Sequence, residues 1–247
     1  MKFGVADFGM NQWDGGSFDF EERLRGLKEI GFEGVERLEG RSPADAIQKA
    51  ASFRRLGMDF ATCRGPNPQA SLRWTAGLGK QYVWTAVQGK DFDTFCRQVN
   101  GQAAACARWG VRVGLHNHMG TLVETQEQLD EFMERCPDCG LILDTAHLAG
   151  AGGDPVAAAA KYADRVVSLH LKDWLLTDPE VGLERWTQRG RFCELGAGNV
   201  DLDNIAVLRT LADAGYDGWV LVEQDTHLQD PFRDLATSRQ YLHKGGF

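Results

Sequence analysis

The chain has 247 residues, of which 43% are hydrophobic and 25% are charged, as in an ordinary globular protein. Its formal net charge of -8 repels phosphate backbones and argues against general nucleic-acid binding. The N-terminus lacks the apolar core of a signal peptide, and no apolar run reaches the length of a membrane span. We therefore expect a cytoplasmic protein without membrane association, with its six cysteines as reduced thiols.

Strands and helices are predicted to alternate along the whole chain. Runs of β-forming residues predict eight strands, at Phe3–Phe8, Val35–Leu38, Met58–Cys63, Tyr82–Val87, Val111–His116, Leu141–Asp144, Val166–Leu171 and Trp219–Glu223. Helical periodicity and capping residues predict helices at Phe20–Ile30, Ser42–Leu56, Asp93–Trp109, Glu124–Cys136, from Asp154 onwards, and at Asp201–Ala214 and Pro231–Leu242. Two segments are less regular. Pro66–Leu78 is expected to be loop and helix, and Trp174–Asn199 is expected to be irregular.

This alternation predicts parallel βα units joined by right-handed crossovers, which either close into a barrel or form an open, doubly wound sheet. Three features favour the barrel: the eight strands, a length near the roughly 250 residues of a (β/α)8 barrel, and polar residues at the ends of several strands. No GxGxxG follows the first strand, so a dinucleotide-binding fold loses its main support. We predict an α/β protein with one TIM-barrel domain over residues 1–247.

Four of the predicted strands end in residues that bind metals or move protons: His116, Asp144, His170 and Glu223. Side chains alternate along a strand, and each of these residues lies opposite the apolar positions that would face the helices. The carboxyl ends of barrel strands are where such proteins carry their chemistry. Two histidines and two carboxylates form a mixed site suited to Mn, Co, Fe, Zn or Mg. A divalent ion there would polarise a carbonyl, and Glu223 is the expected base for the neighbouring proton.

Several of the candidate residues have a simpler explanation when taken alone. A single histidine such as His147 is more often a hydrogen-bonded structural residue than a ligand. Asp144 is in the right place to cap a short helix. Glu36, at the end of the second strand, is explicable as a solvated loop charge. The agreement of four strand ends in position and parity favours the site over these separate explanations.

Five segments in the second half of the chain are similar to segments of a known protein superfamily. They are HNHMGTLVET (116–125), LDTAHLAGAGGDP (143–155), YADRVVSLHLKD (162–173), ELGAGNVD (194–201) and AGYDGWVLVEQD (214–225). With them the chain resembles the sugar isomerase/epimerase superfamily of xylose isomerase-like TIM barrels, and within it the inosose dehydratase-like branch. The first half matches in general form, chiefly through GFEGVE (31–36). The resemblance agrees with the predicted barrel.

In that superfamily one divalent ion is held at strand ends by a Glu, an Asp, a His and a final Glu. The resemblance implies three ligands here: Asp144, His170 and Glu223. The first Glu position falls on His116, a departure from the pattern. Either His116 replaces that glutamate, or His118 or Glu124 contributes the fourth ligand. The expected cofactor is one Mn, Co, Mg, Zn or Fe ion.

The remaining site residues are expected to serve the substrate. His147, three residues after the aspartate, corresponds to a histidine that contacts substrate oxygens in members of the superfamily, and we add Glu36 as a second contact. Lys172 fits the HxKD pattern and is expected to bind a hydroxyl or carbonyl. Glu223, His118 and Lys172 are the expected catalytic residues.

The resemblance implies removal of a proton α to the carbonyl of a keto-sugar or keto-cyclitol, followed by isomerisation, epimerisation or dehydration. It also implies a small-molecule substrate and a homo-oligomer, either a dimer or a tetramer. Three alternatives remain at this point. They are β-elimination of an aglycone from a 3-keto-glycoside, an endonuclease IV-like phosphodiesterase, and a sugar-binding barrel without activity.

Overall fold

The computed structural model describes residues 1–247 except 9, 11, 12, 14, 16, 18, 88, 228 and 229. Within the described residues, eight parallel strands form one nearly closed barrel: β1 (Lys2–Val5), β2 (Gly34–Glu39), β3 (Asp59–Arg64), β4 (Tyr82–Trp84), β5 (Arg112–His116), β6 (Gly140–Asp144), β7 (Val166–Leu171) and β10 (Trp219–Val222). This confirms the predicted barrel of alternating strands and helices. The predicted strands Phe3–Phe8 and Tyr82–Val87 are shorter in the structure, at four and three residues.

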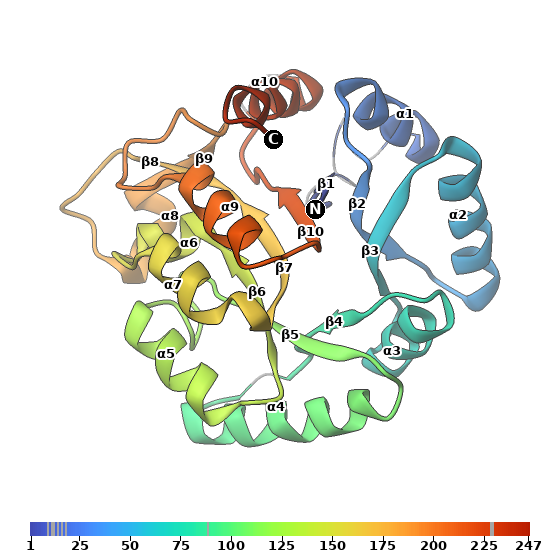
Figure 1. Ribbon diagram of the computed structural model, residues 1–247, viewed down its shortest axis with the longest axis horizontal. Helices are drawn as coiled ribbons and strands as arrows, with labels where there is room; N and C mark the ends of the chain where they lie inside the picture. Colours follow the sequence, from blue (N-terminus) through green and yellow to red (C-terminus); the bar gives the residue numbers. More distant parts are fainter. Residues whose placement is uncertain are drawn as a thin grey trace.

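Helices surround the strands on the outside, as Figure 1 shows. The longer ones are α1 (Phe20–Ile30), α2 (Pro43–Leu56), α3 (Pro68–Gly77), α4 (Phe92–Ala107), α5 (Gln126–Arg135), α7 (Pro155–Tyr162), α9 (Asn204–Asp213) and α10 (Pro231–Lys244). Short α6 (Thr145–Gly150) and η2 (Ala163–Arg165) complete the ring. Polar caps begin most of these helices; Ser42, for example, accepts the backbone N–H of Asp45, with Pro43 in the first turn.

The strand order is β3-β2-β1-β10-β7-β6-β5-β4, so the first and last barrel strands are neighbours at the centre of the sheet. Between β3 and β4, no backbone pairing is found in the part of the chain that is described. The hydroxyl of Thr62 bridges this seam by donating to the carbonyl oxygen of Tyr82 at 2.5 Å. The barrel is therefore open along one side, next to its shortest strand.

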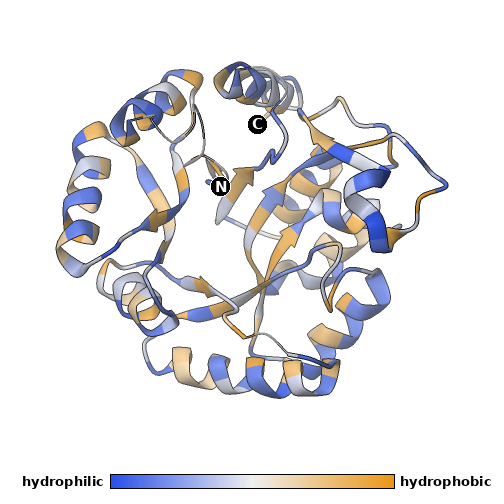
Figure 2. Ribbon diagram, turned by 180° about the vertical axis from the view of Figure 1, so that it is seen from behind, coloured by the Kyte–Doolittle hydropathy of each residue, from blue (hydrophilic) through white to orange (hydrophobic). Residues whose placement is uncertain are grey.

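The core has an outer and an inner part. The outer part lies between the sheet and the helices, where residues such as Leu27, Val99, Phe132 and Leu208 are fully buried. The inner part fills the barrel with a smaller cluster that includes Tyr82, Ile142, Trp219 and Leu221. Figure 2 shows the strands as largely hydrophobic and the outer faces of the helices as hydrophilic.

The segment after β7 differs from its prediction as an irregular stretch. It forms an antiparallel hairpin of β8 (Asp173–Leu176) and β9 (Gly190–Cys193), with η3 (Leu183–Arg185) and α8 (Trp186–Arg189) between them. Isolated two-stranded hairpins have little local stability. This one is supported by packing of Met119, Trp174 and Phe192 in a separate cluster. The prediction missed it because that support comes from distant parts of the chain.

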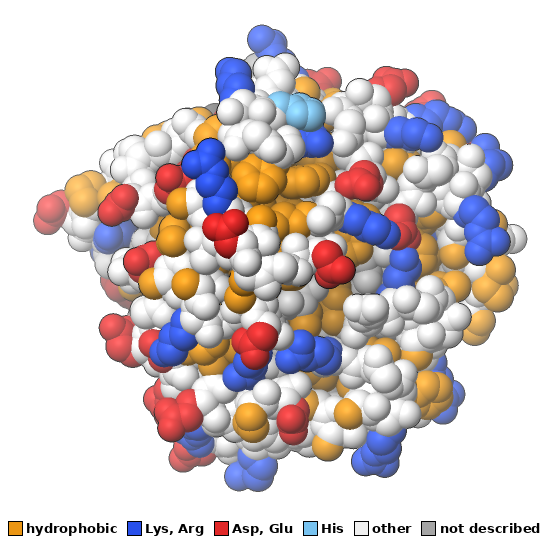
Figure 3. Space-filling model, viewed as in Figure 1, with side chains coloured by type: hydrophobic (Ala, Val, Ile, Leu, Met, Phe, Trp, Pro, Cys, Tyr) orange, Lys and Arg blue, Asp and Glu red, His pale blue; other side chains and the backbone are white. Residues whose placement is uncertain are grey.

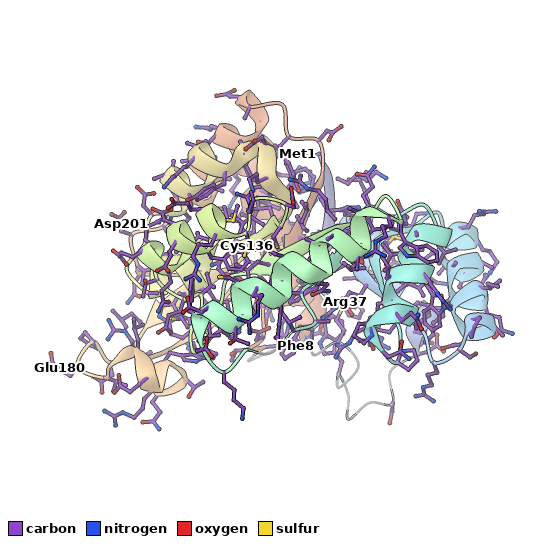
Figure 4. All side chains as sticks on the ribbon, turned by 90° about the horizontal axis from the view of Figure 1, so that it is seen from below. Met1, Phe8, Arg37, Cys136, Glu180 and Asp201 are labelled. Carbon is purple, nitrogen blue, oxygen red and sulfur yellow. The ribbon has the colours of Figure 1, made fainter. Side chains whose placement is uncertain are left out.

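The carboxyl ends of the strands open on one end of the barrel. In Figure 4, Met1 lies towards one end of the molecule, whereas Phe8, which is beyond the end of β1, and Arg37, which is in β2, lie towards the other. The face seen in Figure 3 carries acidic and basic side chains side by side, with hydrophobic ones between them. In the described residues, no helix has both the length and the apolar character needed to cross a membrane.

Candidate metal centre

Four side chains that can hold a metal ion meet at the mouth of the barrel. His116 ends β5, Asp144 ends β6, His170 lies in β7 and Glu223 follows β10 directly. One donor atom from each lies within 4.8 Å of the others. Asp144 and His170 are paired in the sheet register, so their side chains leave neighbouring strands at the same level. The strand ends that the sequence singled out therefore converge on one point.

The donor set fits a divalent ion. Two imidazole nitrogens and two carboxylate oxygens suit first-row ions and magnesium better than a thiolate-preferring metal. Donors about 2.1 Å from one ion lie within about 4.2 Å of one another, so small side-chain rotations bring the four together. Asp144, His170 and Glu223 are buried, and the side chain of His116 is 9% exposed. The four candidate ligands are therefore largely removed from bulk water.

His116 belongs to this cluster, whereas His118 and Glu124, the other candidates for the fourth ligand, lie outside it. The Nδ1–H of His118 donates to the carbonyl oxygen of Met119 at 2.6 Å. The carboxylate of Glu124 accepts the backbone N–H of Gly120 at 2.7 Å. Of the three candidates, His116 is therefore the one whose side chain lies with those of Asp144, His170 and Glu223.

Asp144 uses its two carboxylate oxygens differently. Oδ1 caps α6 by accepting the backbone N–H of His147 at 2.9 Å. Oδ2 faces Nε2 of His116 at 3.3 Å and Nζ of Lys172 at 3.5 Å. Burial would raise the pKa of Asp144, but the positive charge of Lys172 outweighs it and lowers this pKa, so the carboxylate is ionised. The helix cap and the place in the cluster, posed as alternatives by the sequence, are both present.

His170 is held between two carboxylates. Its Nδ1 lies 2.6 Å from Oε2 of Glu223, and its Nε2 lies 3.0 Å from Oε1 of Glu36. The same oxygen of Glu36 accepts the hydroxyl of Tyr82 at 3.1 Å and the indole N–H of Trp84 at 2.9 Å. Burial disfavours a charged ring, but the two carboxylates outweigh it and raise the pKa of His170 to about 10.

Glu36 is fully buried, so the explanation of this residue as a solvated loop charge is wrong. It does not line the cavity described below; it lies behind His170. The sequence indicated Glu36 by its place at the end of a predicted strand, but no sequence pattern predicted its contact with His170. The contact joins residues 134 positions apart.

Lys172 is buried beside the cluster. Its Nζ lies 2.9 Å from Oδ2 of Asp225 and 3.3 Å from Oε2 of Glu223, and it sits 4.2 Å from the ring centre of Phe192. Burial disfavours the ammonium, but Glu223, Asp144 and Asp225 outweigh it and raise the pKa of Lys172, which is therefore charged. The sequence analysis missed Asp225. Its spacing of two residues from Glu223 was the available clue.

His147 and His118 lie against one another, with ring centres 3.6 Å apart. Burial lowers the pKa of both, that of His118 to about 4, so both are neutral near pH 7. Nδ1 of His147 accepts the backbone N–H of Met119 at 3.2 Å, so this ring carries its proton on Nε2. His118 donates from Nδ1, which leaves its Nε2 as an acceptor. One ring therefore offers a donor and its neighbour an acceptor.

The hairpin segment provides an aromatic wall for these histidines. Trp186 of α8 lies edge-on to His118 and His147, at ring-centre distances of 5.5 and 5.6 Å. Phe192 of β9 lies 5.0 Å from His147. Such edge contacts are favourable and exclude water from one side of the site. The segment predicted to be irregular, Trp174–Asn199, therefore covers His118 and His147 on one side.

A cavity of about 790 Å³ opens onto the cluster. Its inner end is lined by Trp84, His116, His118, Lys172 and Glu223. From there it runs along the open side of the barrel into a groove between α3 and α4, which is lined by Leu72, Arg73, Ala105 and Trp109 among others. The cavity is within the range of small-molecule sites and is longer than a single sugar ring requires.

Comparison with known proteins gives consistent matches. Residues 69–244 match the family described as xylose isomerase-like TIM barrel. The chain is 35% identical to rhizopine catabolism protein MocC of Rhizobium meliloti over 152 residues, which cover 59% of this chain and less than half (45%) of that protein. It is 32% identical to inosose dehydratase of Clostridium botulinum (strain Eklund 17B / Type B) over an alignment covering 98% of this chain and 96% of that enzyme.

Solved structures show the same fold at lower identity. The probable 3-DHS dehydratase AsbF from Bacillus anthracis superposes with a TM-score of 0.75 at 14% identity, covering 98% of this chain and 99% of that one. A xylose isomerase-like TIM barrel protein from Mycobacterium smegmatis in complex with magnesium gives 0.69 at 17% identity, covering 99% and 95%. With the family match and the inosose dehydratase alignment, these findings show that the chain belongs to the xylose isomerase-like TIM barrel family.

Proposed function

We propose that this protein is a divalent-metal-dependent enzyme that removes a proton α to the carbonyl of a keto-sugar or keto-cyclitol. The observation that carries the proposal is the cluster of His116, Asp144, His170 and Glu223, which lies at the inner end of a cavity beside a buried lysine. The similarity to inosose dehydratase supports sugar or cyclitol chemistry. The product is then an isomer, an epimer or a dehydrated sugar.

When bound, a divalent ion would supply Lewis-acid polarisation of the substrate carbonyl. Glu223 is the proposed base, because its carboxylate is ionised and belongs to the cluster that would face that carbonyl. Burial would raise its pKa, but Lys172 and His170 outweigh this and lower it. The proton removed from the α-carbon would pass to an oxygen of Glu223.

Lys172 and His147 are the proposed hydrogen-bond donors to the substrate. Nζ of Lys172 and Nε2 of His147 lie 3.3 Å apart, and both carry hydrogen. Two donors that face each other leave room for an acceptor to take both, and a carbonyl or hydroxyl oxygen of the substrate fits that need. Such preorganised donors stabilise negative charge that develops on the oxygen.

His118 is the proposed second proton carrier. Its free Nε2 lies on the cavity wall, and the Met119 carbonyl fixes its tautomer. A proton taken up there from a hydroxyl and returned to a neighbouring carbon would complete an isomerisation. For a dehydration, Nε2 of His118 would first take up a proton from solvent and then deliver it to the departing β-hydroxyl, with water as the leaving group, while the proton on Glu223 returns to solvent.

For Glu36 we propose a role other than the substrate contact that was expected. Its carboxylate accepts from Nε2 of His170, and a metal-binding histidine is commonly oriented by a carboxylate on its other nitrogen. Tyr82 and Trp84 hold the same oxygen of Glu36 in place. In this role Glu36 would direct Nδ1 of His170 towards the ion.

The length of the cavity favours a second candidate, β-elimination of an aglycone from a 3-keto-glycoside. The groove between α3 and α4 begins beyond Trp84 and would hold an aglycone while the sugar ring lies against the cluster. The first step, removal of the α-proton, is the same in both reactions. An endonuclease IV-like phosphodiesterase has less support, because the group of metal-binding side chains found among the described residues has four members, which suits one ion rather than three.

The experiment is an activity screen of protein stripped with a chelator and then reloaded with Mn, Mg, Co or Zn. Keto-inositols, ketoses and 3-keto-glucosides are the substrates. We expect turnover in the reloaded protein only. Glu223→Gln should reduce kcat by orders of magnitude while the fold is retained. Glu124→Gln, which changes a carboxylate outside the cluster, should remain active.

Two outcomes would overturn the proposal. One is a reloaded protein that takes up no metal at micromolar concentration. The other is near-normal turnover in Glu223→Gln. Circular dichroism of each variant would separate a lost activity from a lost fold.

A further inference from the structure

Arg37 is a largely buried arginine that lines the cavity. It lies in β2 next to Glu36, and its side chain is 9% exposed. Its Nε donates to Oδ1 of Asp7 at 2.9 Å, and its guanidinium carbon lies 5.1 Å from the ring centre of Trp84. Figure 4 shows it near Phe8, at the end of the barrel where the strands terminate. Asp7 and Trp84 together fix the plane of the guanidinium.

The two terminal nitrogens of Arg37 have no such anchor. Within the described part of the chain, neither Nη1 nor Nη2 donates a hydrogen bond to any residue, although Arg37 lines the cavity. Arg165 shows what a structural arginine looks like in this protein. Its Nε, Nη1 and Nη2 donate to the carbonyl oxygens of Met133, Cys136 and Cys139. Among the described residues, Arg37 therefore keeps two donor groups without a partner, and it lines the cavity.

The position of Arg37 relative to the candidate metal centre suits a substrate group distant from the reacting carbon. The ring of Trp84 is close to both, with its centre 4.7 Å from that of His116 and 5.6 Å from that of His170, besides its contact with Arg37. Arg37, Trp84, His116 and Glu223 line one cavity. A ligand bound at the cluster can therefore extend along Trp84 to Arg37.

The free edge of a guanidinium presents two parallel N–H donors, which match the two oxygens of a carboxylate. A phosphate ester would bring a second negative charge close to acidic groups already present. Asp7 lies on the Nε side, Oε2 of Glu36 is 3.7 Å from Nε, and Asp225 lines the same cavity. The monoanionic, planar group is the better fit.

We propose that Arg37 binds a carboxylate of the substrate, so that this enzyme acts on a keto-sugar acid or keto-cyclitol acid. This rests on the proposed function for the reacting end of the substrate, but it concerns the opposite end. Arg37 would select the substrate class and orient the sugar along Trp84. It would take no part in moving protons.

The test is the binding of non-reacting probes, so it does not depend on turnover. D-gluconate, D-glucitol and D-glucitol 6-phosphate share a six-carbon chain and differ in the terminal group. Their affinities for the manganese-loaded protein would be measured by calorimetry. We expect D-gluconate to bind roughly 10- to 100-fold more tightly than D-glucitol, as a charge-assisted pair of hydrogen bonds provides.

Variants then assign that preference to Arg37. In Arg37→Gln the ratio of the two affinities should fall to within about threefold. Arg37→Lys keeps the positive charge but loses the two parallel N–H donors, so its affinity ratio should be intermediate. Arg64→Gln is the matched control, because Arg64 lines the same cavity but is 59% exposed and pairs with Glu39. It should keep the full ratio. If Arg37→Gln does not fold, the comparison of Arg37→Lys with Arg64→Gln carries the test.

The outcomes are distinct. A preference for D-gluconate that persists in Arg37→Gln and Arg37→Lys, or that is missing from the wild type, would overturn the inference. If Arg37 favoured D-glucitol 6-phosphate but not D-gluconate, the assignment of a carboxylate as its ligand would be overturned. Turnover of neutral ketoses without any Arg37-dependent acid binding would leave the proposed function standing and remove this inference. Binding of D-gluconate through Arg37 without any turnover would support this inference and count against the proposed function.

Discussion

At the scale of single residues, hydrogen bonds of the backbone decide what each histidine can do. Met119 offers its N–H to His147 and its carbonyl oxygen to His118, so the two stacked rings are held in opposite tautomers. His170 differs from both, because a carboxylate oxygen faces each of its ring nitrogens, Glu36 at Nε2 and Glu223 at Nδ1. The four histidines near the site are therefore not interchangeable, although the sequence presents them alike.

Replacing Glu36 by Gln should weaken metal binding. The amide keeps the shape of the side chain but removes the negative charge beside Nε2 of His170, and loss of such an outer partner commonly costs about 10- to 100-fold in metal affinity. Titration with manganese in a calorimeter measures the change. Glu39→Gln, at an exposed position of the same strand, is the control. Equal affinities of Glu36→Gln and the wild type would mean that His170 needs no such partner.

His116→Ala should weaken metal binding more strongly, because one of four donors is lost. We expect a loss of at least about 100-fold, measured by competition with a chromogenic chelator. His118→Ala removes a neighbouring ring that lies outside the cluster and should bind the metal almost as well as the wild type. The opposite ranking would transfer the ligand role to His118, and equal affinity of both variants to the wild type would point to Glu124.

At the scale of elements, close contact between β2 and β3 sets the position of Glu36 and Arg37. Gly34 opens β2 and pairs with Asp59. A methyl group at Gly34 would collide with the carbonyl oxygen of Asp59 and with the ring of Trp219. The glycine therefore permits the approach of two strands, and the buried side chains further along β2 depend on that approach.

Gly34→Ala should destabilise the fold by about 1–3 kcal/mol, the usual cost of overpacking. Urea unfolding measures the free energy. Gly101→Ala is the matched control in the middle of α4, where a methyl group would meet no atom within 4 Å. It should be stabilising by about 0.5–1 kcal/mol, because alanine is the better helix former. Similar effects of the two substitutions would show that the strand contact is not tight.

At the scale of the whole molecule, the two ends of the chain are tied together. The first strand pairs with the last barrel strand over four residues, from Lys2 with Trp219 to Val5 with Val222. The outer core is continuous from Phe3 to Leu242. We therefore propose that residues 1–247 unfold as one domain, in a single calorimetric transition.

Metal removal should lower the temperature of that transition. An ion at about 100 times its dissociation constant stabilises the folded state by about 2.7 kcal/mol, which corresponds to roughly 5–10 °C for a chain of this size. Differential scanning calorimetry with and without chelator measures the shift. The His116→Ala protein should show a much smaller one. Identical curves for the wild type in both conditions would argue that no ion binds the folded protein.

The sequence by itself determined the barrel and the strand ends that carry the site. Alternation along a strand and periodicity along a helix are local properties, so they reveal which side chains face the mouth of the barrel, including Asp144, His170 and Glu223. The choice among His116, His118 and Glu124 could not be made in this way, because His116 ends a strand and His118 and Glu124 follow closely after it.

Only the tertiary structure decided which residues meet across the barrel. Glu36 reaches His170, Asp225 reaches Lys172, Arg37 lies on Trp84, and the hairpin brings Trp186 and Phe192 over the histidines. These contacts join segments that are tens of residues apart, and no local pattern encodes them. They follow from the closure of the barrel, which places the ends of all its strands around one small opening.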